Sequence, residues 1–299
     1  MAENLTNRCG YVAISGRPNV GKSTLLNRII GQKLAITSHK PQTTRHTILG
    51  VKTDIRGQVI YVDTPGIHQR GEQAMNRYLN RTAKSVLADV DLVLFVVDAL
   101  RWTDEDAAVL AALQKNQTPI LLVINKVDRV TPKAALLPFL EEIGRKHDFL
   151  AVIPLSAKTG KGIELLETEI LAALPAGDNI FPPDQLSDRS ERFFAAELIR
   201  EQLIQRYSKE IPYALTVEIE KFEETEQMYR ISALIWVERP GQKGILIGAG
   251  GTALKEAARQ ARIEMEKLFD RKVHLNVWVK VKQSWSNDEK ALSLLGYGD

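Results

Sequence analysis

Short apolar runs alternate with amphipathic segments through the first 175 residues of the chain. The apolar runs are rich in valine, isoleucine and leucine, and they lie at residues 11–15, 59–62, 92–97, 120–124 and 150–155. Helical periodicity marks the segments between them, at residues 23–30, 75–87, 104–115, 134–147 and 162–174. Nearly unbroken apolar runs are typical of parallel strands that helices cover on both faces. The pattern therefore predicts a doubly wound, mostly parallel α/β sheet with its ligand at the carboxyl ends of the strands.

The remaining chain has a different pattern. Residues 176–190 include Gly177 and the pair Pro182-Pro183, which is typical of a linker. A helix with a capping-box-like start at Asp188 follows. After it come two strand-like runs at residues 214–222 and 228–237, a glycine-rich segment between helical stretches at 241–251, a helix at 252–269 and a last strand at 272–281. We therefore expect a first domain at 1–175, a linker at 176–190 and an α+β domain at 191–299 with the order α-β-β-α-α-β.

The composition is that of an ordinary globular protein of two domains. The 299 residues are 44% hydrophobic and 26% charged. The net charge of +3 does not by itself indicate a nucleic-acid surface, so any basic surface must be local. The single cysteine, Cys9, excludes an intrachain disulfide and favours a reducing cytoplasm. Residues 1–8 lack the apolar core of a signal peptide, and no run is long enough to span a membrane, which leaves peripheral membrane contact open.

A complete phosphate loop lies between the first apolar run and the first helix. It has the pattern G-x-x-x-x-G-K-[ST], and its residues, with the next one, are Gly16, Arg17, Pro18, Asn19, Val20, Gly21, Lys22, Ser23 and Thr24. The backbone N–H groups of such a loop surround phosphate oxygens at the N-terminus of a helix. Lys22 is expected to contact the β- and γ-phosphates, and the Ser23 hydroxyl to bind Mg²⁺. The alternative is a plain glycine turn between a strand and a helix. Such a turn would not need every residue of the phosphate-loop pattern, whereas this chain has them all.

A second motif follows the apolar run at 59–62. Its residues are Asp63, Thr64, Pro65 and Gly66. The Asp63 carboxylate is expected to hold Mg²⁺ through water, and the Gly66 N–H to contact the γ-phosphate. The tetrapeptide alone is a weak signal, and its position at the end of a parallel strand makes it more specific.

Two further motifs select the base. In the first, Asn125-Lys126-Val127-Asp128, the Asp128 carboxylate can accept hydrogen bonds from N1–H and the 2-amino group of guanine. Adenine has an acceptor at N1 and no 2-amino group, so its binding would leave the carboxylate desolvated and unpaired. Lys126 is expected to lie along the base plane and Asn125 to connect the loops. The second motif, residues Ser156, Ala157 and Lys158, is expected to donate a backbone N–H to the guanine carbonyl oxygen. Four motifs in this order predict GTP as the ligand.

The first domain resembles a bacterial Ras-like GTPase. Gln42-Thr43-Thr44-Arg45 resembles the switch I motif of the family that contains Era, EngA and MnmE. The resemblance implies a threonine that binds Mg²⁺ in the GTP state, with Thr44 as the first candidate and Thr43 as the second. Lys22, Thr44, Asp63 and Gly66 are thus the residues expected to act in catalysis.

Two positions bear on the rate of hydrolysis. Ile67 stands where Ras-type enzymes carry a glutamine that orients water, so slow hydrolysis is expected. Relatives that use K⁺ bind it through an asparagine that corresponds to Asn19. Stimulation by K⁺ is therefore a hypothesis for this chain.

The second domain resembles a type II KH domain. The turn Gly248-Ala249-Gly250-Gly251 has the G-x-x-G pattern, which lets a backbone approach single-stranded nucleic acid without a Cβ clash. In the helix after it, Leu254, Ala258, Ala261, Met265 and Leu268 are expected to form the buried stripe. The predicted RNA contacts are the four turn residues with Lys243, Lys255, Arg259, Arg262 and Lys280. A solvated charged face is the alternative interpretation of these basic residues.

A GTPase domain followed by a KH domain resembles the Era family over essentially the whole chain. The resemblance implies GTP or GDP and Mg²⁺ as ligands, binding to the 3′ end of 16S ribosomal RNA, and assistance in assembly of the small ribosomal subunit. It also implies a cytoplasmic protein with partial inner-membrane association, and no feature of the sequence suggests an obligate oligomer.

One position departs from the family pattern. Family members usually carry a lysine in or just after the turn, whereas this chain has Ala249-Gly250 and then Thr252-Ala253. Either the surrounding basic residues carry more of the affinity or RNA binding is weaker than is typical. The alternative function is a GTPase whose second domain docks protein or membrane.

Overall fold

The computed structural model describes residues 7–40, 42–65, 74–86, 89–207 and 211–297. The chain forms two compact units. The first unit comprises residues 1–35, 44–69 and 79–188, and the second comprises residues 36–43, 70–78 and 189–299.

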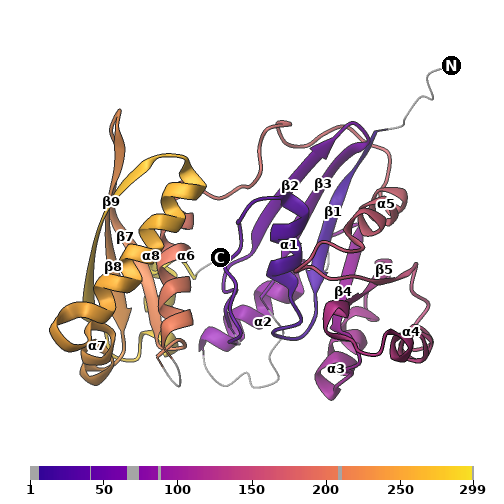
Figure 1. The fold of residues 1–299 in the computed structure, drawn as a ribbon, viewed down its shortest axis with the longest axis horizontal. Helices are drawn as coiled ribbons and strands as arrows, with labels where there is room; N and C mark the ends of the chain where they lie inside the picture. Colours follow the sequence, from indigo (N-terminus) through magenta and orange to yellow (C-terminus); the bar gives the residue numbers. More distant parts are fainter. Residues whose placement is uncertain (1–6, 41, 66–73, 87–88, 208–210, 298–299) are drawn as a thin grey trace. The chain divides into compact units, whose positions relative to one another are not determined.

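The first unit contains a six-stranded sheet with the order β2-β3-β1-β4-β5-β6. Its strands are β1 (Arg8–Ser15), β2 (Ile48–Asp54), β3 (Gly57–Asp63), β4 (Leu92–Asp98), β5 (Ile120–Asn125) and β6 (Val152–Pro154). All neighbouring pairs are parallel except β2 and β3. The predicted doubly wound sheet is confirmed, and the carboxyl ends of β1, β3, β4 and β5 share one edge (Figure 1).

Helices cover both faces of this sheet. They are α1 (Lys22–Ile30), α2 (Ala74–Val86), of which residues 79–86 belong to this unit, α3 (Asp104–Leu113), α4 (Leu136–Gly144) and α5 (Ile163–Ala173). Short 3-10 turns also occur, η1 (Val127–Arg129) and η2 (Lys133–Ala135). Phe95 and Leu122 pack against Leu110 of α3 and Ile143 of α4 in one buried cluster. Strand residues of the alternate set, such as Ile14, are equally buried on the opposite face, where α1 and α5 lie (Figure 1). Burial on both faces explains why these strands have nearly unbroken apolar sequences.

Strand β2 was not predicted from the apolar pattern. It pairs antiparallel with β3 at the edge of the sheet. Ile48 and Val51 are buried, whereas Lys52 and Thr53 are partly exposed and Asp54 is exposed. An edge strand of this kind lacks the continuous apolar run that marks the central strands.

The chain after α5 stays attached to the edge of the first unit through residues 176–188, here called the strap. The strap forms isolated bridges from Ala176 to Arg8 and from Ser187 to Gly50. The side chain of Gln58 in β3 is fully buried, and it forms hydrogen bonds with the middle of the strap. The Gln58 Oε1 atom accepts hydrogen bonds from the N–H groups of Ile180 and Phe181, at 2.9 and 2.8 Å. The strap therefore satisfies backbone and side-chain groups that an edge would otherwise expose.

The second unit contains a three-stranded sheet with the order β7-β8-β9. Its elements are α6 (Glu191–Arg206), β7 (Leu215–Glu224), β8 (Met228–Val237), α7 (Pro240–Ile247), η3 (Ala249–Gly251), α8 (Thr252–Phe269), β9 (Lys272–Val281), η4 (Trp285–Asn287) and α9 (Glu289–Leu294). Strand β7 is antiparallel to β8, and β9 is parallel to β8. The predicted order α-β-β-α-α-β is confirmed.

The core of the second unit lies between one face of its sheet and the helices α6 and α8. Ile231 and Ile235 of β8 belong to the same buried cluster as Leu203 of α6 and Met265 of α8. The buried stripe of α8 includes Ala257, whereas the predicted Ala258 is partly exposed. The residues that pack into the core are spaced three or four apart, as on one face of a helix, and they are 254, 257, 261, 265 and 268. Ala257 fits this spacing.

Segment 36–43 belongs to the second unit through contacts with α6. The Thr37 N–H donates to Glu201 Oε1 at 2.8 Å, and Arg200 donates to the carbonyl oxygen of Thr43. Glu201 and Arg200 are both buried, and Arg200 forms a buried ion pair with Glu197. These charged contacts explain why a segment from the first half of the chain groups with the second unit.

Replacing Gln58 with leucine is expected to lower the free energy of unfolding of the first unit by about 2 to 4 kcal/mol, because two N–H groups of the strap lose the buried oxygen that accepts their hydrogen bonds. Chemical unfolding measures the loss, and amide hydrogen exchange at Ile180 and Phe181 localises it. Gln185→Leu, on the strap itself, is the matched control because Gln185 is half-buried and its side chain donates to a single carbonyl oxygen of the described residues, that of Ser187. Equal effects of the two substitutions would contradict the role assigned to Gln58.

Candidate nucleotide-binding site

The phosphate loop occupies the turn between β1 and α1, as predicted. Gly16 and Gly21 have φ angles of 150° and 101°. A Cβ atom on Gly16 would lie 2.4 Å from the carbonyl oxygen of Val96, and one on Gly21 would lie 2.4 Å from Nδ2 of Asn125. Both positions therefore require glycine. No side chain caps α1, so its first N–H groups are oriented for an anion.

Lys22 is folded into the loop. Its Nζ atom donates to the carbonyl oxygens of Gly16 and Arg17 at 2.8 and 3.1 Å. Burial lowers the pKa of Lys22 to about 8, the nearby Asp63 carboxylate opposes this shift, and the Arg17 guanidinium adds to it. A bound phosphate would stabilise the charged ammonium in the same manner as Asp63. The lysine is thus placed to exchange loop carbonyls for phosphate oxygens.

Three oxygen-bearing side chains meet beside the loop. Ser23 Oγ donates to Asp63 Oδ2 at 2.8 Å, and it lies 2.9 Å from Thr44 Oγ1. Asp63 is fully buried, its Oδ1 atom has no hydrogen-bond partner among the described residues, and burial raises its pKa to about 6. Hard oxygen ligands and an unpaired buried carboxylate oxygen are what Mg²⁺ requires. The predicted magnesium ligands Ser23, Thr44 and Asp63 therefore fit the ion.

The two candidate threonines differ in their surroundings. Thr44 lies beside Ser23 and Asp63. Thr43 donates its hydroxyl hydrogen to the carbonyl oxygen of Lys40 at 2.6 Å and lies 3.1 Å from Ser38 Oγ. Of the two, Thr44 is the residue at the oxygen cluster.

Asn125, at the end of β5, connects three loops. Its Nδ2 donates to the carbonyl oxygen of Val20 at 2.8 Å. Its Oδ1 accepts from the N–H groups of Lys126 and Ala157 at 2.7 and 3.0 Å. This is the connecting role that the sequence predicts. Of the backbone N–H groups at residues 156–158, one of which is expected to donate to guanine, that of Ala157 donates to Asn125 in this structure.

Asp128 is exposed and oriented by its neighbour. Ser156 Oγ donates to Asp128 Oδ1 at 2.6 Å, and this hydrogen bond is the main reason that the pKa of Asp128 lies below its usual range. An ionised carboxylate at the surface is the acceptor that the N1–H and 2-amino group of guanine need. The loop at 156–158 is further supported by Arg28 of α1, which donates to the carbonyl oxygens of Ala157 and Lys158.

Further predicted nucleotide residues follow β3. Thr64, directly after the strand, is buried and donates to the carbonyl oxygen of Ile14 at 3.2 Å, and Pro65 follows it. Gly66 and Ile67 lie outside the described residues.

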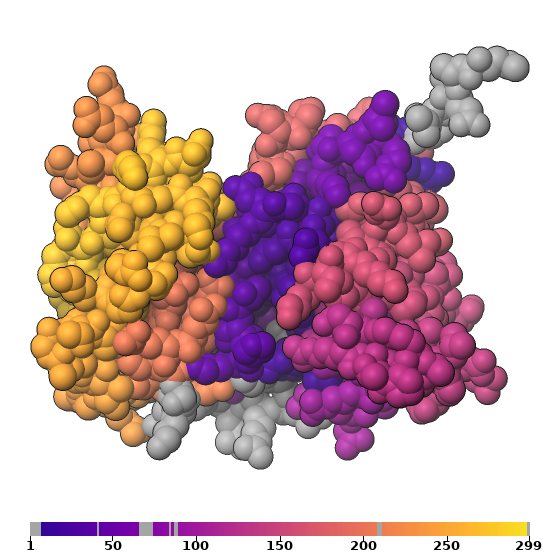
Figure 2. Space-filling model, viewed as in Figure 1, coloured from indigo at the N-terminus to yellow at the C-terminus, as the bar shows by residue number. Residues whose placement is uncertain are grey.

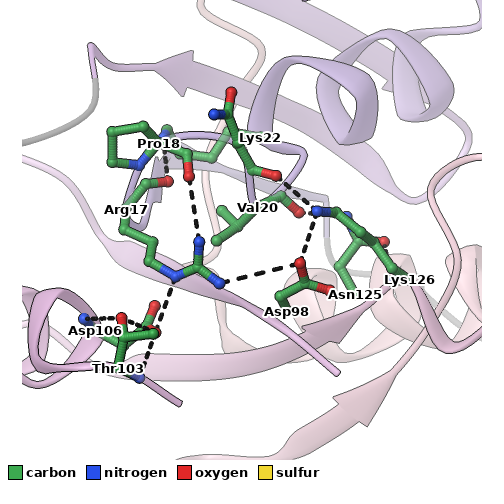
Figure 3. Close-up of polar contacts among 10 residues, drawn as sticks. Arg17, Pro18, Val20, Lys22, Asp98, Thr103, Asp106, Asn125 and Lys126 are labelled. Carbon is green, nitrogen blue, oxygen red and sulfur yellow. Dashed lines mark hydrogen bonds and ion pairs between the residues drawn. The ribbon is translucent and has the colours of Figure 1, made fainter. Parts of the chain in front are cut away.

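Sequence reasoning missed two carboxylates near the phosphate loop, Asp98 and Asp106. Arg17 Nε donates to Asp106 Oδ2 at 2.9 Å, and Lys126 Nζ donates to Asp98 Oδ2 at 2.8 Å (Figure 3). Asp98 directly follows the apolar run 92–97, as Asp63 and Asn125 follow theirs. That pattern is a signal that could have identified Asp98, whereas Asp106 has none beyond its helix-capping position.

The G-x-x-G turn of the second unit has little side-chain cover over its backbone. Gly248, Gly250 and Gly251 have φ angles of 72°, 58° and 76°. A Cβ atom on Gly250 or Gly251 would meet no atom within 4 Å, and Ala249 is exposed. The helices on either side, α7 and α8, coloured orange to gold, lie on the surface seen in Figure 2. The turn therefore offers its backbone to an approaching partner.

The predicted basic residues differ in how far they are neutralised. Arg259 pairs with Glu256 at 2.9 Å, and this contact is the main reason that the pKa of Glu256 falls to about 2. Arg262 pairs with Glu266 at 2.9 Å, and Lys280 lies 3.8 Å from Glu220. Lys243 of α7 and Lys255 of α8 are exposed and make no ion pair within the described part of the chain. These two lysines flank the turn in sequence and carry its available positive charge.

No helix among the described residues is long and apolar enough to cross a membrane.

Family models match both parts of the chain. A model described as a 50S ribosome-binding GTPase matches residues 11–126, and a KH domain model matches residues 210–286. The predicted pairing of a GTPase with a KH domain is therefore confirmed.

Full-length relatives and solved structures agree with this pairing. GTPase Era of Pseudomonas savastanoi pv. phaseolicola is 56% identical over 299 residues, which is 100% of both chains. GTPase Era of Pseudomonas aeruginosa is 55% identical over 98% of this chain and 96% of its own length. A crystal structure of an Aquifex aeolicus Era variant bound to GDP and AlF4⁻ matches with a TM-score of 0.94 at 36% identity, covering 98% of this chain and 100% of the other.

A second structure, Era in complex with MgGDPNP and nucleotides 1506–1542 of 16S ribosomal RNA, matches with the same TM-score of 0.94, identity of 36% and coverage of 98% and 100%.

The relatives share more than half of their residues with this chain along essentially its whole length. The phosphate, magnesium and base loops also lie where a GTPase needs them. The chain therefore belongs to the GTPase Era family.

Proposed function

We propose that this protein hydrolyses GTP to control how its KH domain binds the 3′ end of 16S ribosomal RNA during assembly of the small ribosomal subunit. The observation that carries the RNA assignment is the turn Gly248–Gly251, with its glycines at positive φ and with Lys243 and Lys255, which form no ion pair with any described residue. The full-length match to Era bound to 16S nucleotides supports it.

The chemistry is the attack of water on the γ-phosphorus, with GDP as the leaving group. Lys22 and the N–H groups of the phosphate loop stabilise the charge on the β- and γ-phosphate oxygens. Mg²⁺, when held by Ser23, Thr44 and Asp63, supplies further positive charge to the same oxygens. Isoleucine at position 67 cannot hold the attacking water by a hydrogen bond, so the intrinsic rate is expected to be slow.

The switch follows from the same contacts. GTP is expected to order residues 33–50 through Thr44 and residues 66–74 through Gly66, and loss of the γ-phosphate to release them. Release of these segments would end the state of the protein that binds RNA. Loading with GDP or with a non-hydrolysable GTP analogue, followed by sequencing of crosslinked RNA, separates the two states.

We also infer a monomer that resides in the cytoplasm and associates in part with the inner membrane. Light scattering of the purified protein tests the first expectation, and its share in washed inner-membrane fractions tests the second.

Base recognition rests on Asp128. The substitution Asp128→Asn is expected to weaken GDP and GTP binding by at least about 100-fold and to favour xanthosine nucleotides, because xanthine has an acceptor where guanine has the 2-amino donor. Titration with fluorescent guanine and xanthine nucleotides measures both changes. Asp148→Asn, at an exposed position of the same unit, is the control and is expected to change neither. Unchanged GTP affinity in Asp128→Asn would refute the assignment.

RNA binding rests on the bare turn. Gly250→Asp is expected to reduce affinity for a 16S 3′-end fragment by about tenfold or more, because it places a carboxylate where the phosphates approach, while Asp tolerates the left-handed conformation. Gly296→Asp is the matched control, since Gly296 is also exposed, has a φ of 84° and has open space for a side chain.

Failure to recover any RNA with the unaltered protein would remove the RNA assignment. In that case the alternative, a KH domain that docks protein or membrane, would stand. Equal affinities of Gly250→Asp and Gly296→Asp would instead place RNA binding elsewhere on the protein.

Potassium dependence rests on Asn19, whose side chain is exposed on the phosphate loop. GTP hydrolysis is expected to be several-fold faster in K⁺ than in Na⁺ at equal ionic strength, and Asn19→Ala is expected to abolish the difference, since a cation beside the phosphates would replace the missing water-orienting group. Phosphate release assays measure the rates. Equal rates of the unaltered protein in both salts would disprove the potassium hypothesis.

A further inference from the structure

Asp98 lies beside the base loop because of strand register. It is the last residue of β4, and Asp98 and Asn125 are register partners in the parallel pair β4–β5. The residue after Asn125 is Lys126, whose Nζ donates to Asp98 Oδ2 at 2.8 Å. The side chains of Lys126 and Asp98 are only 19% and 17% exposed, so this ion pair is shielded from solvent more than a surface pair is.

Lys126 is held at both ends. Its backbone has a left-handed φ of 65°, and its N–H donates to Asn125 Oδ1 at 2.7 Å. Its ammonium group also donates to the carbonyl oxygen of Asn19 at 2.7 Å, in addition to Asp98. The four-carbon stem between these anchors is therefore extended along one path before any base arrives. A stem ordered in advance loses less rotamer entropy on binding than a free one.

A second ion pair, between Arg17 and Asp106, adjoins Asp98. An Nη atom of Arg17 lies 4.0 Å from Asp98 Oδ2, and Arg17 Nε donates to Asp106 Oδ2 at 2.9 Å. Asp106 is fully buried and belongs to the capping box of α3, where it also accepts from the N–H and hydroxyl of Thr103. Figure 3 shows the resulting alternation of Asp106, Arg17, Asp98 and Lys126, which runs from the start of α3 across the phosphate loop to the base loop.

We propose that Asp98 is a positioning residue for guanine nucleotides: it fixes the Lys126 ammonium so that the lysine stem covers one face of the base, and Arg17, anchored on Asp106, fixes Asp98. The proposal rests on the assignment of Asn125–Asp128 as the base loop. Because the stem contacts a face of the base and neither its edge nor the phosphates, its loss must affect GDP, GTP and inosine nucleotides alike. This property separates Asp98 from Asp128, which reads the edge of the base.

The test compares Asp98→Ala, Lys126→Ala and the double variant in nucleotide titrations. Asp98→Ala is expected to weaken GDP, GTP and IDP binding each by about tenfold, the effect of losing one charged hydrogen bond, with the GDP-to-IDP affinity ratio unchanged. Lys126→Ala is expected to weaken binding at least as much. If Asp98 acts through Lys126, adding Asp98→Ala to Lys126→Ala causes no further loss.

Two further variants keep the test decisive. Asp104→Ala makes the same chemical change at an exposed position of α3 and is expected to leave nucleotide affinity unaltered. Asp98→Asn preserves the shape of the side chain and is expected to weaken binding in the same direction if Asp98→Ala does not fold.

Opposite outcomes are distinguishable. If Lys126→Ala leaves GDP affinity unchanged, the base-loop assignment is wrong and the proposal falls with it. If Lys126→Ala weakens binding but Asp98→Ala does not, or if their losses multiply in the double variant, the positioning role of Asp98 alone is overturned.

Discussion

The nucleotide site depends on one buried amide, the side chain of Asn125. It donates to the phosphate loop at Val20 and accepts from Lys126 and Ala157 in the two loops around the base. Gly21 must lack a Cβ because Asn125 lies against it. A side chain that is both donor and acceptor, with all of these contacts made in a buried place, allows little independent movement of the three loops. Phosphate and base recognition are thereby linked in one rigid arrangement.

The same site contains charges whose ionisation burial disfavours. Burial lowers the pKa of Lys22 to about 8 and raises that of Asp63 to about 6. Each group is stabilised in its charged form by what it is expected to bind, phosphate for Lys22 and Mg²⁺ for Asp63. The ligands therefore complete an electrostatic arrangement that the protein alone leaves unbalanced.

In the second unit, ion pairs neutralise some of the basic side chains and leave others available. The arginines of α8 face glutamates one turn away, whereas Lys243 and Lys255, near the glycine turn in sequence, have no such partner among the described residues. The turn itself contains no lysine. The two lysines on the flanking helices are placed to supply the charge that the turn itself lacks, and an ammonium on a long stem can reach a phosphate from there.

The sequence by itself determined the two folds, the phosphate loop, the base loop and the glycine turn, because each depends on local features: an apolar run, a glycine, and a polar residue directly after a strand. Only the tertiary structure revealed β2 and the strap held by Gln58. It also revealed the contacts of Asp98 and Arg17. These features depend on which residues of distant segments lie opposite each other. Strand register and edge pairing decide that placement, and no periodicity along a single segment encodes it.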